Sequence, residues 1–192
     1  MMTRLTLISH ASTAATRSAR FPANEPLDDQ GRARASALAN HLPGADRAWV
    51  SPELRARQTA EALSLAAVVA HELRDCDYGT WRGCSFEELS ARDPESVSSW
   101  LRDPQAAPHG GESTASLIQR VADWLDRQRT APGRAIVVTH PAIIRAAVVH
   151  AIGAPEPSFW RIDVSPLSQA CLSGQDGRWN LRYVGPIQSK RA

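Results

Sequence analysis

Cysteine and long apolar runs are both scarce in this chain. It has three cysteines, Cys76, Cys84 and Cys171, and no Cys-x-x-C pair. An odd count without that spacing argues against a disulfide framework and against a cysteine-based zinc site. No stretch approaches the roughly 18 apolar residues of a membrane span, and the N-terminus lacks the apolar core of a signal peptide. We therefore expect a cytoplasmic protein with no membrane partner.

Lysine is almost absent, and the overall charge is nearly balanced. Of 22 basic residues only Lys190 is a lysine, and the formal net charge is +2. So small an excess gives no support for nucleic acid as a partner, although it is compatible with an anionic substrate. The planar fork of arginine suits phosphate, which makes some of the arginines candidate phosphate ligands. A genome biased towards Arg and Ala codons is the simpler explanation for most of them.

The chain also lacks internal repeats, low-complexity tracts and linkers. With 192 residues, 43% of them hydrophobic and 22% charged, it has the length and composition of one globular domain with a sizeable core. We therefore expect a single domain over residues 1–192.

Short apolar runs alternate with amphipathic segments along the chain. Strands are expected at 3–9, 48–50, 68–71 and 135–139, and helices at 32–42, 51–63, from 85, from 113 and from 140. Asp28 or Asp29 is expected to cap the first of these helices and Ser51 the second. Prolines between residues 94 and 108 predict a broken, loop-rich stretch. Two or three β segments are expected between residues 159 and 184, with a turn at 173–177.

This alternation of strands and helices predicts the fold class. Strands that alternate with helices form a largely parallel sheet with helices on both faces. We expect an α/β fold, a three-layer α/β/α sandwich whose mostly parallel central sheet has an antiparallel C-terminal portion.

Two of the expected strands end in a polar residue followed by a histidine. Residues 3–9 lead to His10, and residues 135–139 lead to His140. In open α/β sheets, ligands bind beyond the carboxyl ends of the strands. One loop histidine would indicate little. Two units of the same design place both imidazoles in one cleft if the strands are parallel neighbours.

An arginine and a carboxyl group are expected near the same edge of the sheet. Arg55 lies in the first turns of a helix that follows a strand, and Asp75 lies just past a third strand. These four groups suit phosphoryl transfer to nitrogen. A neutral imidazole attacks phosphorus, cations hold the equatorial oxygens, and an acid protonates the leaving oxygen.

Five segments in a fixed order carry a resemblance to a known family. They are Pro26-Leu27-Asp28-Asp29-Gln30-Gly31-Arg32, Ser51-Pro52-Glu53-Leu54-Arg55-Ala56-Arg57-Gln58-Thr59-Ala60, Leu73-Arg74-Asp75-Cys76-Asp77-Tyr78-Gly79-Thr80-Trp81-Arg82-Gly83, Gly111-Glu112-Ser113 and Val137-Val138-Thr139-His140. Together they resemble the histidine phosphatase superfamily, with its phosphoglycerate mutase-like fold. The similarity runs from about residue 5 to residue 172 and is greatest to the short phosphatase branch, which includes the alpha-ribazole phosphatase-like proteins.

The resemblance implies a role for each matched residue. His10 would be the nucleophile that becomes phosphohistidine, and His140 and Arg55 would bind the transferring phosphoryl group. Asp75 takes the place of the usual proton donor, and the hydroxyl of Thr13 would be a further phosphate contact. The family mechanism implies no metal and no cofactor.

The first motif departs from the family pattern of arginine-histidine-glycine. Ser9 replaces an arginine that normally clamps the phosphate, and serine supplies neither charge nor a bidentate fork. Ala11 replaces the glycine, and Pro141 after the second histidine removes a backbone donor. Losing one clamp can remove about 3 kcal/mol of transition-state stabilisation. Either the pocket is rebuilt around another cation, with Arg17 and Arg20 as the candidates, or catalysis is weakened or altered.

Three functions follow, in order of preference. The first is hydrolysis of phosphomonoesters of a small metabolite through phosphohistidine on His10. The second is a degenerate family member that binds a phosphorylated or anionic ligand with little or no turnover. The third is phosphoglycerate mutase-type transfer, ranked last because residues 85–111 leave little room for the insertion of cofactor-dependent mutases. The sequence does not name the substrate and leaves a homodimer open.

Overall fold

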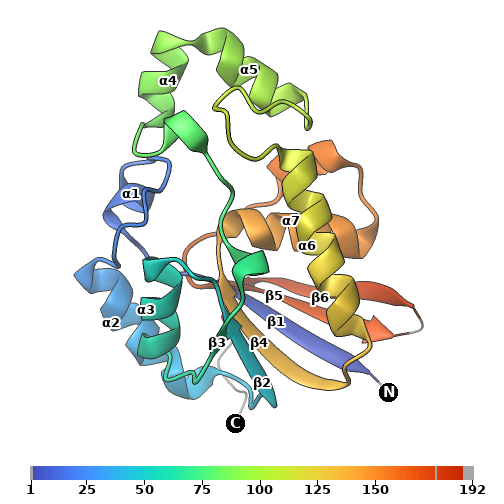
Figure 1. Ribbon diagram of the computed structural model, residues 1–192. Coiled ribbons are helices and arrows are strands. Elements are labelled where there is room, and N and C mark those ends of the chain that lie inside the picture. Colours follow the sequence, from blue (N-terminus) through green and yellow to red (C-terminus); the bar gives the residue numbers. More distant parts are fainter. Residues whose placement is uncertain (1, 176, 188–192) are drawn as a thin grey trace.

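A single six-stranded sheet forms the centre of the molecule. We describe a computed structural model, which covers residues 2–175 and 177–187 (Figure 1). The strand order is β3-β2-β4-β1-β5-β6. The strands β1 to β4 pair in parallel, whereas β5 and β6 pair antiparallel, as predicted. The strands are β1 (Thr3–Ser9), β2 (Arg47–Val50), β3 (Val68–Val69), β4 (Gly133–Thr139), β5 (Ser168–Gln175) and β6 (Arg178–Pro186).

Helices cover both faces of this sheet, which confirms the predicted α/β fold. Figure 1 shows α2 and α3 on one side and α6 and α7 on the other. The helices are α1 (Ala14–Arg17), α2 (Asp29–Leu38), α3 (Leu54–Ala62), α4 (Phe86–Arg92), α5 (Pro94–Arg102), α6 (Thr114–Arg129) and α7 (Pro141–Ile152). Short 3₁₀ helices lie at η1 (Ala39–His41), η2 (His71–Leu73), η3 (Gly79–Trp81) and η4 (Glu156–Arg161). Among the described residues, no helix combines the length and apolarity needed to cross a bilayer.

Strand β1 shows why the sheet is covered on both sides. Its side chains alternate between faces. Leu5 and Leu7 pack in the core with α6 and α7, whereas Ile8 packs in a second core with α2 and α3. A strand that is apolar on both faces must be buried on both faces. The carboxyl end of β1, with the residues that follow it, therefore lies inside the molecule.

Helices α4 and α5 stand apart from the sheet, joined to it by the segment between β3 and α4 (Figure 1). The prediction of a broken stretch here was wrong for residues 94–102. Pro94 occupies the first turn of α5, where its missing N–H costs no hydrogen bond, and Asp93 caps the helix by accepting from the Ser96 N–H. Later prolines do fall in a loop, as predicted.

Two other boundaries differ from the sequence prediction. His71 begins η2 instead of continuing β3. Residues 156–161 form η4, so the antiparallel portion begins only at Ser168. Asp28 caps α2 by accepting from the Gly31 N–H, as expected. Of the predicted hairpin turn, Asp176 lies outside the described residues, as does Lys190.

Two glycines allow the segment that carries Asp75 to pack against the loop before α6. The Glu112 N–H donates to the Asp77 carbonyl at 2.8 Å. A Cβ atom on Gly111 would lie 2.0 Å from that same carbonyl oxygen, and one on Gly79, at φ +46°, would lie 2.0 Å from the His109 carbonyl. Only glycine permits so close an approach of two backbones.

We therefore expect Gly111→Ala to lower the free energy of unfolding by about 3 kcal/mol, as severe overpacking does. Gly44→Ala is the matched control, because nothing lies within 4 Å of its added Cβ. That change should stay within about 0.5 kcal/mol. Urea denaturation of the two variants measures the difference. Equal stabilities would contradict the close approach.

Candidate active site

Pairing between β1 and β4 brings the two strand-end histidines together. Ser9 pairs with Thr139 in the parallel register, and the His10 N–H donates to the Thr139 carbonyl at 2.8 Å. The imidazole centroids of His10 and His140 lie 5.3 Å apart. Both side chains are buried. Their strands are parallel neighbours, which is the condition on which the sequence analysis expected the two imidazoles to meet.

The His10 ring has one nitrogen engaged in a hydrogen bond. Its Nδ1 lies 2.8 Å from the Ala11 carbonyl oxygen. A carbonyl oxygen only accepts, so Nδ1 carries the proton and Nε2 of the neutral ring has the lone pair. Burial, together with the neighbouring His140 and Arg55, lowers the pKa of His10 to about 3. At neutral pH the ring is therefore uncharged, with Nε2 able to act as a nucleophile.

Arg55 and Asp75 form a buried ion pair beside the histidines. Arg55 is the second residue of α3, which follows β2, and only 1% of it is exposed. Its Nη2 lies 2.6 Å from Asp75 Oδ2. Among the described residues, its Nε and Nη1 have no hydrogen-bond partner. A buried guanidinium with two free donors is suited to an anion, because unmet donors are costly in a desolvated site.

The Asp75 carboxylate is held ionised by its surroundings. Burial alone would raise its pKa, but His140 and Arg55 outweigh burial and hold the pKa below its usual value. The Cys76 N–H also donates to Oδ1 at 2.9 Å. Without a ligand, then, this carboxyl group carries a negative charge.

Glu53 is a part of the site that the sequence prediction missed. Its Oε2 lies 2.9 Å from His140 Nε2, and its Oε1 accepts from the Asp75 N–H at 3.2 Å. Burial would raise the pKa of Glu53, but the hydrogen bonds from His140 and Ser51 lower it to about 2. His140 is thus flanked by two carboxylates, since its Nδ1 lies 3.4 Å from Asp75 Oδ2.

The expected helix start explains why Glu53 was overlooked. Ser51 was predicted to cap α3, with Glu53 inside the first turn. Instead the helix begins at Leu54, Glu53 occupies the N-cap position without a capping hydrogen bond, and the Ser51 hydroxyl contacts His140 Nε2 at 2.7 Å. Both side chains therefore turn to the histidine. A glutamate directly after Ser-Pro was the available signal.

Arg145 is the second residue that the prediction missed. A cleft of about 110 Å³ is lined by His10, Asp75, Tyr78 and Arg145, among others. Arg145 lies five residues after His140 on α7, and its Nε donates to the Ile162 carbonyl at 2.8 Å. Among the described residues it forms no ion pair. The signal was an arginine one turn beyond a strand-end histidine.

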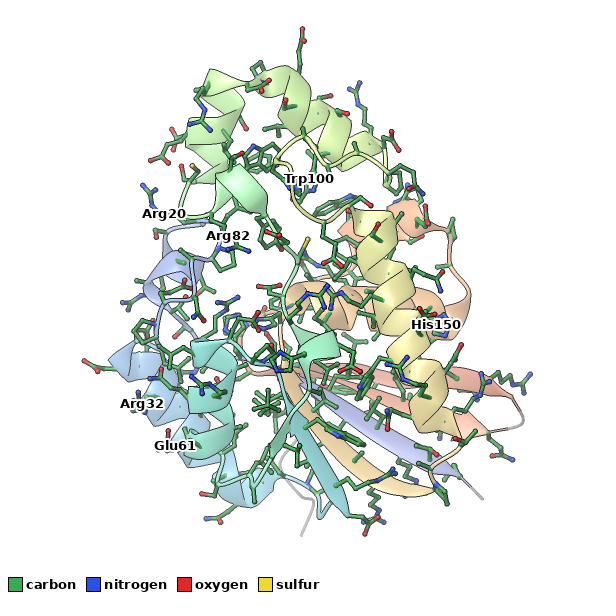
Figure 2. All side chains as sticks on the ribbon, in the orientation of Figure 1. Arg20, Arg32, Glu61, Arg82, Trp100 and His150 are labelled. Atoms are coloured by element: carbon green, nitrogen blue, oxygen red, sulfur yellow. The ribbon has the colours of Figure 1, made fainter. Side chains whose placement is uncertain are left out.

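The two candidate arginines for replacing the missing clamp are both paired with carboxylates. Arg17 Nε lies 3.3 Å from Asp28, and Arg17 does not line the His10 cleft. Arg20 lines the cleft, but its Nη2 lies 2.8 Å from Glu88 and its Nη1 donates to the Gly83 carbonyl. Figure 2 shows Arg20 between α1 and the lower end of α4.

In the structure, the hydroxyls of Ser9 and Thr13 are both engaged in contacts within the protein. Thr13 caps α1 and donates to Glu25 at 3.0 Å. Ser9 is fully buried, and the one hydrogen-bond contact of its Oγ among the described residues is with the His10 carbonyl at 3.5 Å. Within the described part of the chain, no group of three His, Cys, Asp or Glu side chains is placed to hold a metal ion.

Comparisons with known proteins agree on one family. The model of the histidine phosphatase superfamily (branch 1) matches residues 5–185. The Bifunctional protein Rv2228c of Mycobacterium tuberculosis is 33% identical over 95% of this chain, which spans 53% of that relative's length. Phosphoserine phosphatase 1 of Hydrogenobacter thermophilus is 28% identical over 92% of the chain and 89% of its own.

A solved structure repeats the same architecture. It is named "putative alpha-ribazole-5'-P phosphatase" and comes from Escherichia coli. It superimposes with a TM-score of 0.88 at 25% identity, covering 99% of both chains. The chain therefore spans about half the length of the first curated relatives but the full length of this one.

Proposed function

The chain belongs to the histidine phosphatase superfamily (branch 1), and we propose that it hydrolyses phosphomonoesters of a small metabolite through a phosphohistidine on His10. Its similarity to a phosphoserine phosphatase supports the reaction class. The observation that carries the proposal is the neutral, buried His10 ring beside an arginine with two unpaired donors.

His10 is the nucleophile of the first step. Because the Ala11 carbonyl holds the proton on Nδ1, the Nε2 lone pair attacks phosphorus. The Nε2–P bond forms as the P–O ester bond breaks, and the leaving oxygen takes a proton from Asp75. A neutral imidazole needs no deprotonation before the attack.

Arg55 and His140 stabilise the charge on the transferring phosphoryl group. The Nε and Nη1 donors of Arg55 bind the equatorial oxygens, which satisfies donors that are otherwise unpaired. His140 lies at the N-cap of α7, so the positive end of a 12-residue helix adds to the same field.

Asp75 changes its protonation state when substrate binds. In the free protein it is ionised and paired with Arg55. Phosphoryl oxygens compete for that arginine and bring negative charge close to the carboxylate, so its pKa rises and it takes up a proton. It then protonates the leaving alcohol. In the second step the carboxylate takes a proton from the water that attacks phosphohistidine, which releases phosphate and regenerates His10.

The degenerate alternative, ligand binding with little turnover, is supported by the charges around His140. Ser9 brings no cation to the site, and Glu53 adds a second carboxylate within 2.9 Å of His140. Both changes make the site less positive, which weakens stabilisation of a phosphoryl transition state. The same residues then bind a phosphorylated ligand through Arg55 without fast transfer.

The first prediction is that His10 carries covalent phosphate during turnover. Rapid quenching with ³²P-labelled aryl phosphate should give acid-labile, base-stable label on His10, and His10→Ala should abolish both label and turnover. His71→Ala, which changes an exposed histidine on η2, should keep both. Turnover that survives His10→Ala sinks the nucleophile assignment, and binding of phosphate without any label leaves the degenerate alternative.

The second prediction is that the effect of Asp75→Asn depends on the leaving group. Hydrolysis of alkyl phosphates should fall by about 10²–10⁴-fold, the usual contribution of general acid catalysis. Activated aryl phosphates need little protonation and should lose about ten-fold or less. Asp77→Asn is the control, a half-exposed carboxylate two residues further on. Equal losses on both substrates would contradict the role of Asp75 as acid.

The third prediction tests how the site works without the arginine that Ser9 replaces. Arg145 lines the His10 cleft without a carboxylate partner among the described residues, so we propose that it supplies the second positive charge. Arg145→Gln should weaken binding of inorganic phosphate about ten-fold, as loss of one charge-assisted contact does. Adding Ser9→Arg to that variant should restore the affinity, because it places a guanidinium group beside His10.

Two controls accompany this series in the same calorimetric titration. Ser9→Met in the Arg145→Gln background adds bulk without charge and should restore nothing. Arg17→Ala should leave phosphate affinity unchanged, because Arg17 is exposed and paired with Asp28. Unchanged affinity in Arg145→Gln would remove Arg145 from the phosphate site.

A further inference from the structure

A hollow lined by aromatic side chains adjoins the His10 cleft. Its volume is about 210 Å³. Its aromatic lining, which we call the aromatic pocket, consists of Phe21, Tyr78, Phe86, Trp100, Phe159 and Trp160. These include all three phenylalanines of the chain. They come from the loop before α2, the segment that carries Asp75, α4, α5 and η4, so the fold gathers them from distant parts of the sequence.

The rings that form the wall hold one another in place. Trp100 on α5 packs edge-on against Trp160 at 4.4 Å between centroids, and Phe21 meets Trp100 at 5.6 Å. Figure 2 shows Trp100 projecting from α5 towards the body of the molecule. Phe86 also lines the hollow, and it differs from these rings because 41% of it is exposed. Core packing accounts for Trp100, whereas Phe86 presents an apolar ring to the hollow.

The aromatic pocket borders the cleft where phosphoryl transfer is proposed. Both spaces are lined by Arg20, Pro22, Tyr78 and Arg145. The guanidinium of Arg145 lies over the Phe159 ring at 5.8 Å. A ligand whose phosphoryl group meets His10 therefore has the aromatic pocket directly beyond Arg145.

A second hollow near the site has the opposite chemistry. It measures about 300 Å³ and is lined by Glu53, Arg55, Asp75 and Arg82, among others. Among the described residues that line the hollow of the aromatic pocket, Arg20 and Arg145 are charged and none is a carboxylate. An apolar group leaving water gains free energy against the six rings of the aromatic pocket, whereas the described lining of the polar hollow offers it no aromatic ring, and there it would desolvate the charges of Glu53, Arg55, Asp75 and Arg82.

From this arrangement we infer that the aromatic pocket binds the alcohol part of the substrate, and that this part is an aromatic or other flat, apolar ring system. The inference rests on the proposed function, which places the phosphoryl group at His10. A dry apolar cavity of about 150 Å³ is enough for benzene, so this space accepts one ring or two fused rings. Edge-on contacts with the tryptophans add to simple burial.

Two phosphonates test the inference without needing turnover, because their C–P bond is not hydrolysed. Calorimetry should show 2-naphthylmethylphosphonate binding about ten-fold or more tightly than propylphosphonate. Phe86→Ala and Trp160→Leu should each reduce this ratio at least about three-fold. Arg82→Gln, a change in the polar hollow, should leave the ratio unaltered. Phe86 is exposed, so its truncation keeps the fold even if Trp160→Leu does not.

Equal affinity for the two phosphonates would overturn the inference. So would a preference that survives both aromatic substitutions, or one that is lost in Arg82→Gln. The outcomes also separate it from the proposed function. If His10 is labelled but the two phosphonates bind equally, only the inference about the aromatic pocket is wrong. If the naphthyl phosphonate binds more tightly but His10 is never labelled, the proposed hydrolysis is wrong and the pocket assignment stands.

Discussion

Burial forces Arg55 and Asp75 to ionise together, because neither charge could leave water without the other. Their contact, 2.6 Å between Nη2 and Oδ2, fixes the guanidinium beside His10. There its positive charge adds to burial in keeping that imidazole neutral. The pair in turn depends on a close backbone approach, since Gly111 packs directly on the segment that carries Asp75. The neutral state of His10 thus depends on the ion pair, and the ion pair depends on the close backbone packing.

The site has a different balance of charge from the arrangement that the family resemblance implies. A serine stands where the family has an arginine, and Glu53 brings a further carboxylate to His140. The low pKa of Glu53, about 2, means that its negative charge persists across the physiological pH range. A phosphoryl group held at His10 would meet the buried Arg55 clamp and the proposed second charge of Arg145, together with the carboxylates of Glu53 and Asp75. Tight binding of the alcohol part in the aromatic pocket would offset this loss by contributing binding energy remote from phosphorus.

Much of this account was predictable from the sequence because strand ends have a fixed geometry. Parallel strands share a carboxyl edge, so His10, His140 and the start of α3 with Arg55 were bound to converge once the α/β pattern was recognised. Arg145 and Glu53 were not predictable in this way. Which way each side chain points depends on tertiary contacts, here the Ile162 carbonyl and the displaced start of α3. For the candidates Arg17 and Arg20, the carboxylates that pair with them, Asp28 and Glu88, could likewise not be identified from the sequence.

The central claim is that His10 is neutral, with its proton on Nδ1 and its lone pair on Nε2. Nitrogen-15 NMR of histidine-labelled protein reports the tautomer and the charge of each ring directly. The account predicts that the His10 signals are those of the Nδ1–H neutral form and do not titrate between pH 8 and pH 5. A His10 ring that protonates near pH 6.5, or that carries its proton on Nε2, would contradict it.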